Sequence, residues 1–124
     1  VGKLNKQVFK QYFETYHKKK LSILRRFVEN GFKVLVISDP PTRTIDPDVT
    51  KNIHLWKFYD KEALKIFYEA GCDVFNAEDH FGGAHFNESY YSSRIDNDGN
   101  LDWFHGSNKY YLELANVIND YANS

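Results

Sequence analysis

The chain lacks methionine and has little cysteine or proline: its 124 residues contain no Met, one Cys and three Pro. The single cysteine, Cys72, excludes an intrachain disulfide and a cysteine-rich zinc site. No stretch approaches the ~18 apolar residues of a membrane-spanning helix, and no signal-peptide pattern is found at the N-terminus. Because the chain starts with Val1 and has no Met, we expect a piece of a longer protein and assign no compartment.

An excess of charge of either sign is also missing. Sixteen Lys and Arg face seventeen Asp and Glu, which gives a formal net charge of −1. Nucleic-acid binding needs a basic surface that this balance does not supply. The run Lys18–Lys20 and the pair Arg25–Arg26 are typical of a solvated helix face. We therefore expect no nucleic-acid partner.

Aromatic residues are abundant, with ten Phe, nine Tyr and two Trp. The 42% of hydrophobic and 27% of charged residues are ordinary for a globular protein. A chain of this length forms at most one domain with a modest core. We expect that core to be built on rings more than on aliphatic side chains.

Hydrophobic periodicity predicts helix 5–29, strand 33–37, helix 49–70, strand 73–77 and helix 107–121. The first strand is a continuous apolar run, which is typical of a strand buried on both faces. Asn97–Asn100 (NDGN) predicts a tight turn, and Ser107 is the expected N-cap of the last helix. Two helices show apolar stripes, at Ile53, Trp56, Ala63, Phe67 and Ala70 and at Tyr111, Leu114, Ala115, Ile118 and Ala122.

A strand, a helix and a second strand form a βαβ unit, which implies parallel pairing. The fold class is therefore α/β: part of a three-layer, doubly wound, flavodoxin-like parallel sheet in the order α-β-α-β-α. Two strands make an incomplete sheet with unpaired edges. We expect the chain to self-associate or to pair with strands that precede Val1.

Asp102 and His105 lie three residues apart in a segment that precedes the last helix. An aspartate that accepts a hydrogen bond from the Nδ1 of a histidine orients the ring and stabilises its protonated form, as a general base requires. This role predicts a carboxylate–Nδ1 distance of about 2.6–3.2 Å, with Nε2 facing the carboxyl ends of the strands. Trp103 and Phe104 should then pack inward. The alternative is that Asp102 caps only backbone amides and His105 faces solvent.

The segment Asp98–Ser107 (DGNLDWFHGS) resembles the last sequence block of the GDSL/SGNH hydrolases, in which a D-x-x-H motif supplies the triad aspartate and histidine. Lys33–Pro41 is similar to the family's late strand with its proline-containing loop, and Asp73–Asn76 to its final strand. The resemblance implies a serine ester hydrolase or acyltransferase without cofactor or metal. Asp102 would orient His105, the general base, and the substrate would be a small ester or an O-acylated carbohydrate.

The chain departs from this family at its other motifs. It has no G-D-S nucleophile motif, no oxyanion-hole glycine after a second strand and no G-x-N-D motif. No serine in a strand–turn–helix setting is found among Ser22, Ser38, Ser89, Ser92 and Ser93. The resemblance therefore implies that residues 1–124 form a single unit, the C-terminal half of the domain, with the nucleophile before Val1.

Two other interpretations remain open. The first is a non-catalytic α/β module used for binding or assembly. The second is a metal-dependent hydrolase that uses His80, His85, Asp102 and His105, since imidazole and carboxylate groups suit zinc or iron. The spacing of the first two histidines fits no standard ligand motif, and Glu78–His85 is expected to be a flexible loop at the rim of the active site.

Overall fold

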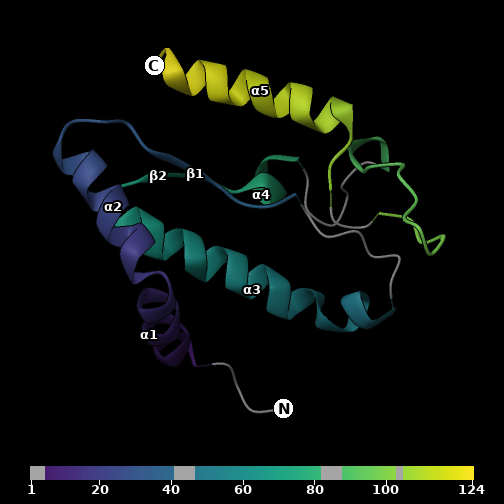
Figure 1. Ribbon diagram of the computed structural model, residues 1–124, viewed down its shortest axis with the longest axis horizontal. Helices are drawn as coiled ribbons and strands as arrows, with labels where there is room; N and C mark the ends of the chain where they lie inside the picture. The colour runs from purple at the N-terminus through teal and green to yellow at the C-terminus, as the bar shows by residue number, and fades with distance from the viewer. Residues whose placement is uncertain (1–4, 41–46, 82–87, 103–104) are drawn as a thin grey trace. The chain divides into compact units, whose positions relative to one another are not determined.

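The computed structural model describes residues 5–40, 47–81, 88–102 and 105–124, with their side chains except at 47–54 and 56. Its elements are α1 (Lys6–Tyr16), α2 (Lys18–Glu29), β1 (Leu35–Ile37), α3 (Pro47–Glu69), β2 (Asp73–Phe75), α4 (Ala77–Phe81), the 3-10 helix η2 (Glu88–Tyr90) and α5 (Asn108–Ala122), coloured in chain order in Figure 1. They belong to two compact units, a first of residues 1–39 and 54–77 and a second of residues 40–53 and 78–124.

The sheet of the first unit consists of β1 and β2, which pair in parallel with Val36 opposite Val74. This confirms the βαβ order and the mixed α/β class. Beyond the paired residues, the Ser38 amide donates to the Phe75 carbonyl at 3.0 Å, and the Ser38 hydroxyl accepts from the Ala77 amide at 2.8 Å. The second strand therefore ends two residues earlier than predicted, because Ala77 already begins α4.

The prediction that the first strand is buried on both faces is wrong. Its three residues are only half-buried, and Val74 of the neighbouring strand is 36% exposed. In the described part of the chain the sheet has two strands. A sheet this narrow offers its strands less neighbouring surface than the interior of a wide parallel sheet does.

The core of the first unit lies among its helices. Leu21 of α2 is 1% exposed and forms a cluster with Ile66 and Ala70. Phe9 and Phe13 of α1 pack against this cluster but are only partly buried. The expectation of a core built on rings more than on aliphatic side chains is therefore wrong for this cluster, whose buried members are all aliphatic. The predicted stripe of helix 49–70 is right at Ala70, which is buried, and at Phe67, which packs against the cluster. It misses the buried Leu64 and Ile66. The side chains of Ile53 and Trp56 lie outside the description.

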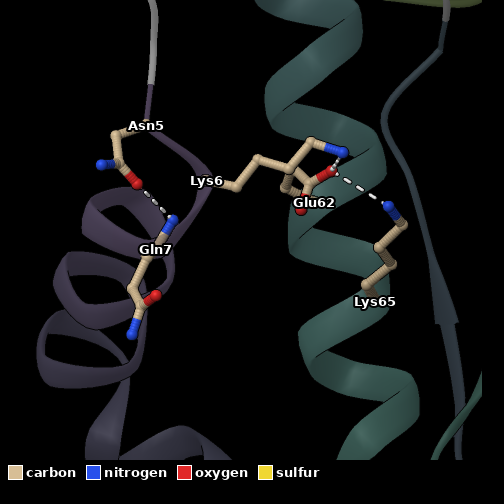
Figure 2. A network of polar contacts seen from close by, with 5 residues as sticks. All are labelled: Asn5, Lys6, Gln7, Glu62 and Lys65. Atoms are coloured by element: carbon tan, nitrogen blue, oxygen red, sulfur yellow. Dashed lines mark hydrogen bonds and ion pairs between the residues drawn. The ribbon is translucent and has the colours of Figure 1, made fainter.

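Ion pairs join α1 to α3 on the surface of the first unit. Figure 2 shows Glu62 between two lysines, with its Oε1 at 3.6 Å from the Nζ of Lys6 and at 3.1 Å from that of Lys65. The start of α1 is capped by Asn5, whose Oδ1 accepts from the amide of Gln7 at 2.9 Å. Of the two pairs of Glu62, only that with Lys6 joins the two helices, because Lys65 and Glu62 both belong to α3. Ion pairs with such exposed lysines contribute little to stability.

The predicted helix 5–29 is two helices that meet at His17. This residue has φ −101° and ψ 19°, and it is at once the C-cap of α1 and the N-cap position of α2. Its ring lies 4.3 Å from that of Phe13 between centroids. The break lets Phe13 on α1 and Leu21 on α2 reach the same core cluster, which a helical periodicity cannot reveal.

Stability of the first unit should depend on pH through His17. Burial, and after it the charge of Lys20, lowers the pKa of His17 below its ordinary value of 6.5. Above that value the ring is neutral in both states; as the pH falls below it, the unfolded state takes up the proton first and the folded state loses stability. Urea unfolding should therefore show a larger loss between pH 7.5 and 5.5 for the natural protein than for His17→Gln. An equal loss in both proteins would contradict this.

The second unit is anchored by one residue of α5. Tyr110 is fully buried, and its ring centroid lies 4.8 Å from that of Phe81. The predicted α5 stripe is wrong for the most part, since Tyr111 and Ile118 are 46% and 43% exposed. The unit packs against the first turn of α5, so the face that is buried differs from the apolar stripe.

Candidate functional site

A tight turn brings Arg94 and Asp102 together, as the NDGN sequence predicts. The carboxylate of Asp96 accepts two backbone N–H groups, those of Asp98 and Asn100, each at 2.9 Å. Gly99 adopts φ +81°, a conformation that glycine reaches at no steric cost.

The two arms of this turn hold Asp102 in place. Ile95 and Leu101 form an antiparallel bridge, and the Asp102 amide donates to the carbonyl of Arg94 at 2.8 Å. The position of the Asp102 backbone is therefore set by a short hairpin-like segment before its side chain makes any contact.

Asp102 makes two contacts with His105. Its Oδ1 accepts from the His105 amide at 3.1 Å, and its Oδ2 lies 3.0 Å from the His105 Nδ1. The predicted carboxylate–Nδ1 hydrogen bond is thus present. With Asp102 ionised, its carboxylate can only accept, so this geometry suits a proton on Nδ1; in the neutral form of the ring Nε2 is then the acceptor, which is the tautomer that a general base needs.

The two side chains differ in exposure, 16% for Asp102 and 65% for His105. The alternative interpretation is wrong in expecting bonds to backbone amides alone, and right that the ring is exposed. Trp103 and Phe104, expected to pack inward, lie outside the described residues. Nε2 was predicted to face the carboxyl ends of the strands, which belong to the first unit, whereas His105 belongs to the second. This direction stays a prediction.

The residues on the C-terminal side of His105 are bound to the 90–92 segment. The His105 carbonyl accepts from the Ser92 amide at 3.0 Å, and Gly106 bridges Tyr91. A Cβ built on Gly106 would lie 2.4 Å from a ring carbon of Tyr110, so only glycine fits there. The ring of Tyr110 thus packs against Gly106, the residue that follows the candidate histidine.

Ser107 confirms its predicted role as the N-cap of α5. Its hydroxyl oxygen accepts from the Tyr110 amide at 3.3 Å and donates to the carbonyl of Ser89 at 2.6 Å. The cap therefore joins the start of α5 to η2. Together with the bonds of the preceding residues it fixes the loop that carries His105.

A pocket of about 610 Å³ lies beside the pair, and its described lining residues all belong to the second unit. Besides Asp102 and His105, its described lining includes Ser89, Ser92, Ser93, Ser107, Arg94 and Lys109. From the sequence, Ser89, Ser92 and Ser93 were rejected as nucleophiles because none lies in a strand–turn–helix setting, and Ser107 was predicted only as an N-cap. Neither Arg94 nor Lys109 was singled out from the sequence; the closeness of Lys109 to the predicted N-cap at Ser107 is the signal that could have placed it near the site.

Of the four residues of the metal hypothesis, the described part of the chain brings only Asp102 and His105 into contact. His80 is an exposed residue of the short helix α4, so residues 78–81 of the expected loop are helical. His85 and the Gly82–Gly83 pair lie outside the description. Among the described residues, no group of three or more His, Cys, Asp or Glu side chains is placed to hold a metal ion.

Comparisons with family models, with curated proteins and with solved structures find no match to this chain. Within the described ranges no helix combines the length and the apolar character needed to cross a membrane. The resemblance of the Asp98–Ser107 segment to the GDSL/SGNH hydrolases therefore stays a prediction.

Proposed function

We propose that this chain is the C-terminal portion of a serine ester hydrolase or acyltransferase of the SGNH type, in which Asp102 and His105 form the general-base pair. The observation that carries the proposal is the 3.0 Å contact between Asp102 Oδ2 and His105 Nδ1 at the wall of a pocket. A histidine held in this way accepts a proton at Nε2, and the carboxylate stabilises the imidazolium that results.

The reaction is acyl transfer from an ester. His105 removes the proton of a serine hydroxyl as the oxygen attacks the ester carbonyl, and then returns it to the leaving alcohol. The acyl-serine is cleaved by water in a hydrolase or by a second alcohol in a transferase. The substrate class is a small ester or an O-acylated carbohydrate, and the nucleophilic serine precedes Val1.

We also propose that the observed two-stranded sheet is part of a wider one. β1 and β2 would be two strands of a three-layer, doubly wound sheet, whose other strands precede Val1. The half-buried β1 and the exposed Val74 support such an extension, because additional strands cover the edges of a narrow sheet.

A fluorophosphonate probe tests the proposal, since it reacts covalently with serines activated by a general base. The natural protein should be labelled at one serine, and His105→Ala should abolish the labelling while the protein stays folded by circular dichroism. Peptide mapping then shows whether the labelled serine precedes Val1. Ester hydrolysis that persists without any labelling, and is stopped by a chelator, would instead identify a metal-dependent hydrolase.

A further inference from the structure

The described lining of the pocket beside His105 holds two cationic side chains and one acid. Arg94 and Lys109 both line it and are both exposed. Asp102 is the one acid among its described lining residues, and its carboxylate is already bound to His105. Within the described part of the chain, neither Arg94 nor Lys109 forms an ion pair. The pocket therefore offers two cations to whatever enters it.

The position of Lys109 at the pocket wall is fixed by contacts other than ion pairs. Its Nζ donates to the Ser89 hydroxyl at 3.1 Å and lies 4.7 Å from the ring centroid of Tyr90. Glu113, one helical turn further along α5, is a suitable ion-pair partner by its spacing. Glu113 instead accepts from the Tyr90 hydroxyl at 2.6 Å, a bond that raises the pKa of Tyr90. Glu113 is thus hydrogen-bonded to Tyr90 and forms no ion pair with Lys109.

The backbone of Arg94 is fixed by hydrogen bonds to two other residues that line the pocket. Its amide donates to the Ser92 hydroxyl at 3.2 Å, and its carbonyl accepts from the Asp102 amide at 2.8 Å. The arginine backbone is therefore linked directly to the residue that orients His105. A group bound by the guanidinium enters the pocket that His105 also lines.

We infer that this pocket binds ligands through an oxyanion group, a carboxylate or a phosphate, held by Arg94 and Lys109. A guanidinium binds such a group through two parallel hydrogen bonds, and an ammonium adds a point charge. The volume of about 610 Å³ suits a small molecule. This inference rests on the proposed function in one respect: the substrates of the Asp102–His105 pair are then esters that carry an oxyanion group close to the ester carbonyl.

Two esters of nearly equal size test the inference in the natural protein. Monomethyl succinate carries a carboxylate and dimethyl succinate does not. Binding is measured by NMR titration of the backbone amides in a phosphate-free buffer, with turnover of each ester measured in parallel. We expect monomethyl succinate to bind roughly tenfold more tightly, with the largest shifts around residues 92–94 and 105–109. Raising the salt concentration should weaken only the binding of the charged ester.

Variants assign the effect to the two cations. Arg94→Gln and Lys109→Gln should each weaken the binding of monomethyl succinate by roughly threefold to tenfold and leave dimethyl succinate unaffected. Lys109→Arg, which keeps the charge, should retain most of the affinity. Arg25→Gln removes one positive charge from α2, in the first unit, and should change nothing. Inorganic phosphate distinguishes the two sources of the oxyanion: tighter binding of phosphate than of monomethyl succinate favours a phosphate-bearing ligand, and the reverse a carboxylate.

The outcomes separate this inference from the proposed function. Equal binding of the two succinate esters, or affinity that survives in the Arg94→Gln, Lys109→Gln double variant, would overturn the oxyanion site whatever the turnover. Binding of the charged ester that depends on both cations supports the site. If that binding is seen and no ester is turned over, the oxyanion site stands and the hydrolase assignment fails.

Discussion

Replacing His105 with alanine is expected to lower kcat/KM for ester hydrolysis by roughly 10³- to 10⁴-fold in the natural protein. The variant loses the group that accepts the serine proton. Asp102→Asn should cost about as much, because an amide in place of the carboxylate no longer holds the Nδ1 proton at 3.0 Å and leaves the ring in the wrong tautomer. Because both residues act on one proton, the double variant should be little worse than either single variant.

Initial rates on a small chromogenic ester measure this effect, and circular dichroism confirms that the variants fold. The matched control is His80→Ala, which removes an exposed histidine from α4 and should leave kcat/KM within about twofold. Activity that is unchanged in both His105→Ala and Asp102→Asn would contradict the general-base role and favour the non-catalytic module.

The largest effect on stability is expected from Tyr110→Ala, which should lower the free energy of unfolding by about 3–5 kcal/mol. Tyr110 is fully buried, its ring lies 4.8 Å from that of Phe81, and it fills the space that the missing Cβ of Gly106 leaves. Removing the ring opens a cavity against Gly106, which follows His105 in the chain, so catalysis should fall together with stability.

Urea unfolding combined with amide hydrogen exchange measures this loss and locates it. Exchange should accelerate in α5 and at residues 90–92, where the amides of Tyr91 and Ser92 bond to the surrounding loop. Leu112→Ala is the control, because Leu112 lies on the same helix and is 69% exposed, and it should cost less than about 0.5 kcal/mol. Losses of similar size in the two variants would show that Tyr110 is not the anchor of the second unit.

Features that depend on short stretches of sequence could be predicted from the sequence alone. The βαβ order, the NDGN turn, the Ser107 cap and the Asp102–His105 hydrogen bond are examples. Each involves residues at most five positions apart, or a periodicity within one element. Local dihedral preferences and side-chain reach are sufficient to determine such features.

Features that depend on packing between distant segments were decided only by the tertiary structure. The chain breaks its first helix at His17 because α1 and α2 share a core with α3, and it buries Tyr110 where the periodicity pointed to Tyr111 and Ile118. The pocket that joins His105 to Arg94 and Lys109 exists because the bonds of residues 90–92 to 105–107 bring together parts of the chain more than ten positions apart. Such contacts follow from how buried surfaces fit one another, and no local pattern in the sequence encodes that fit.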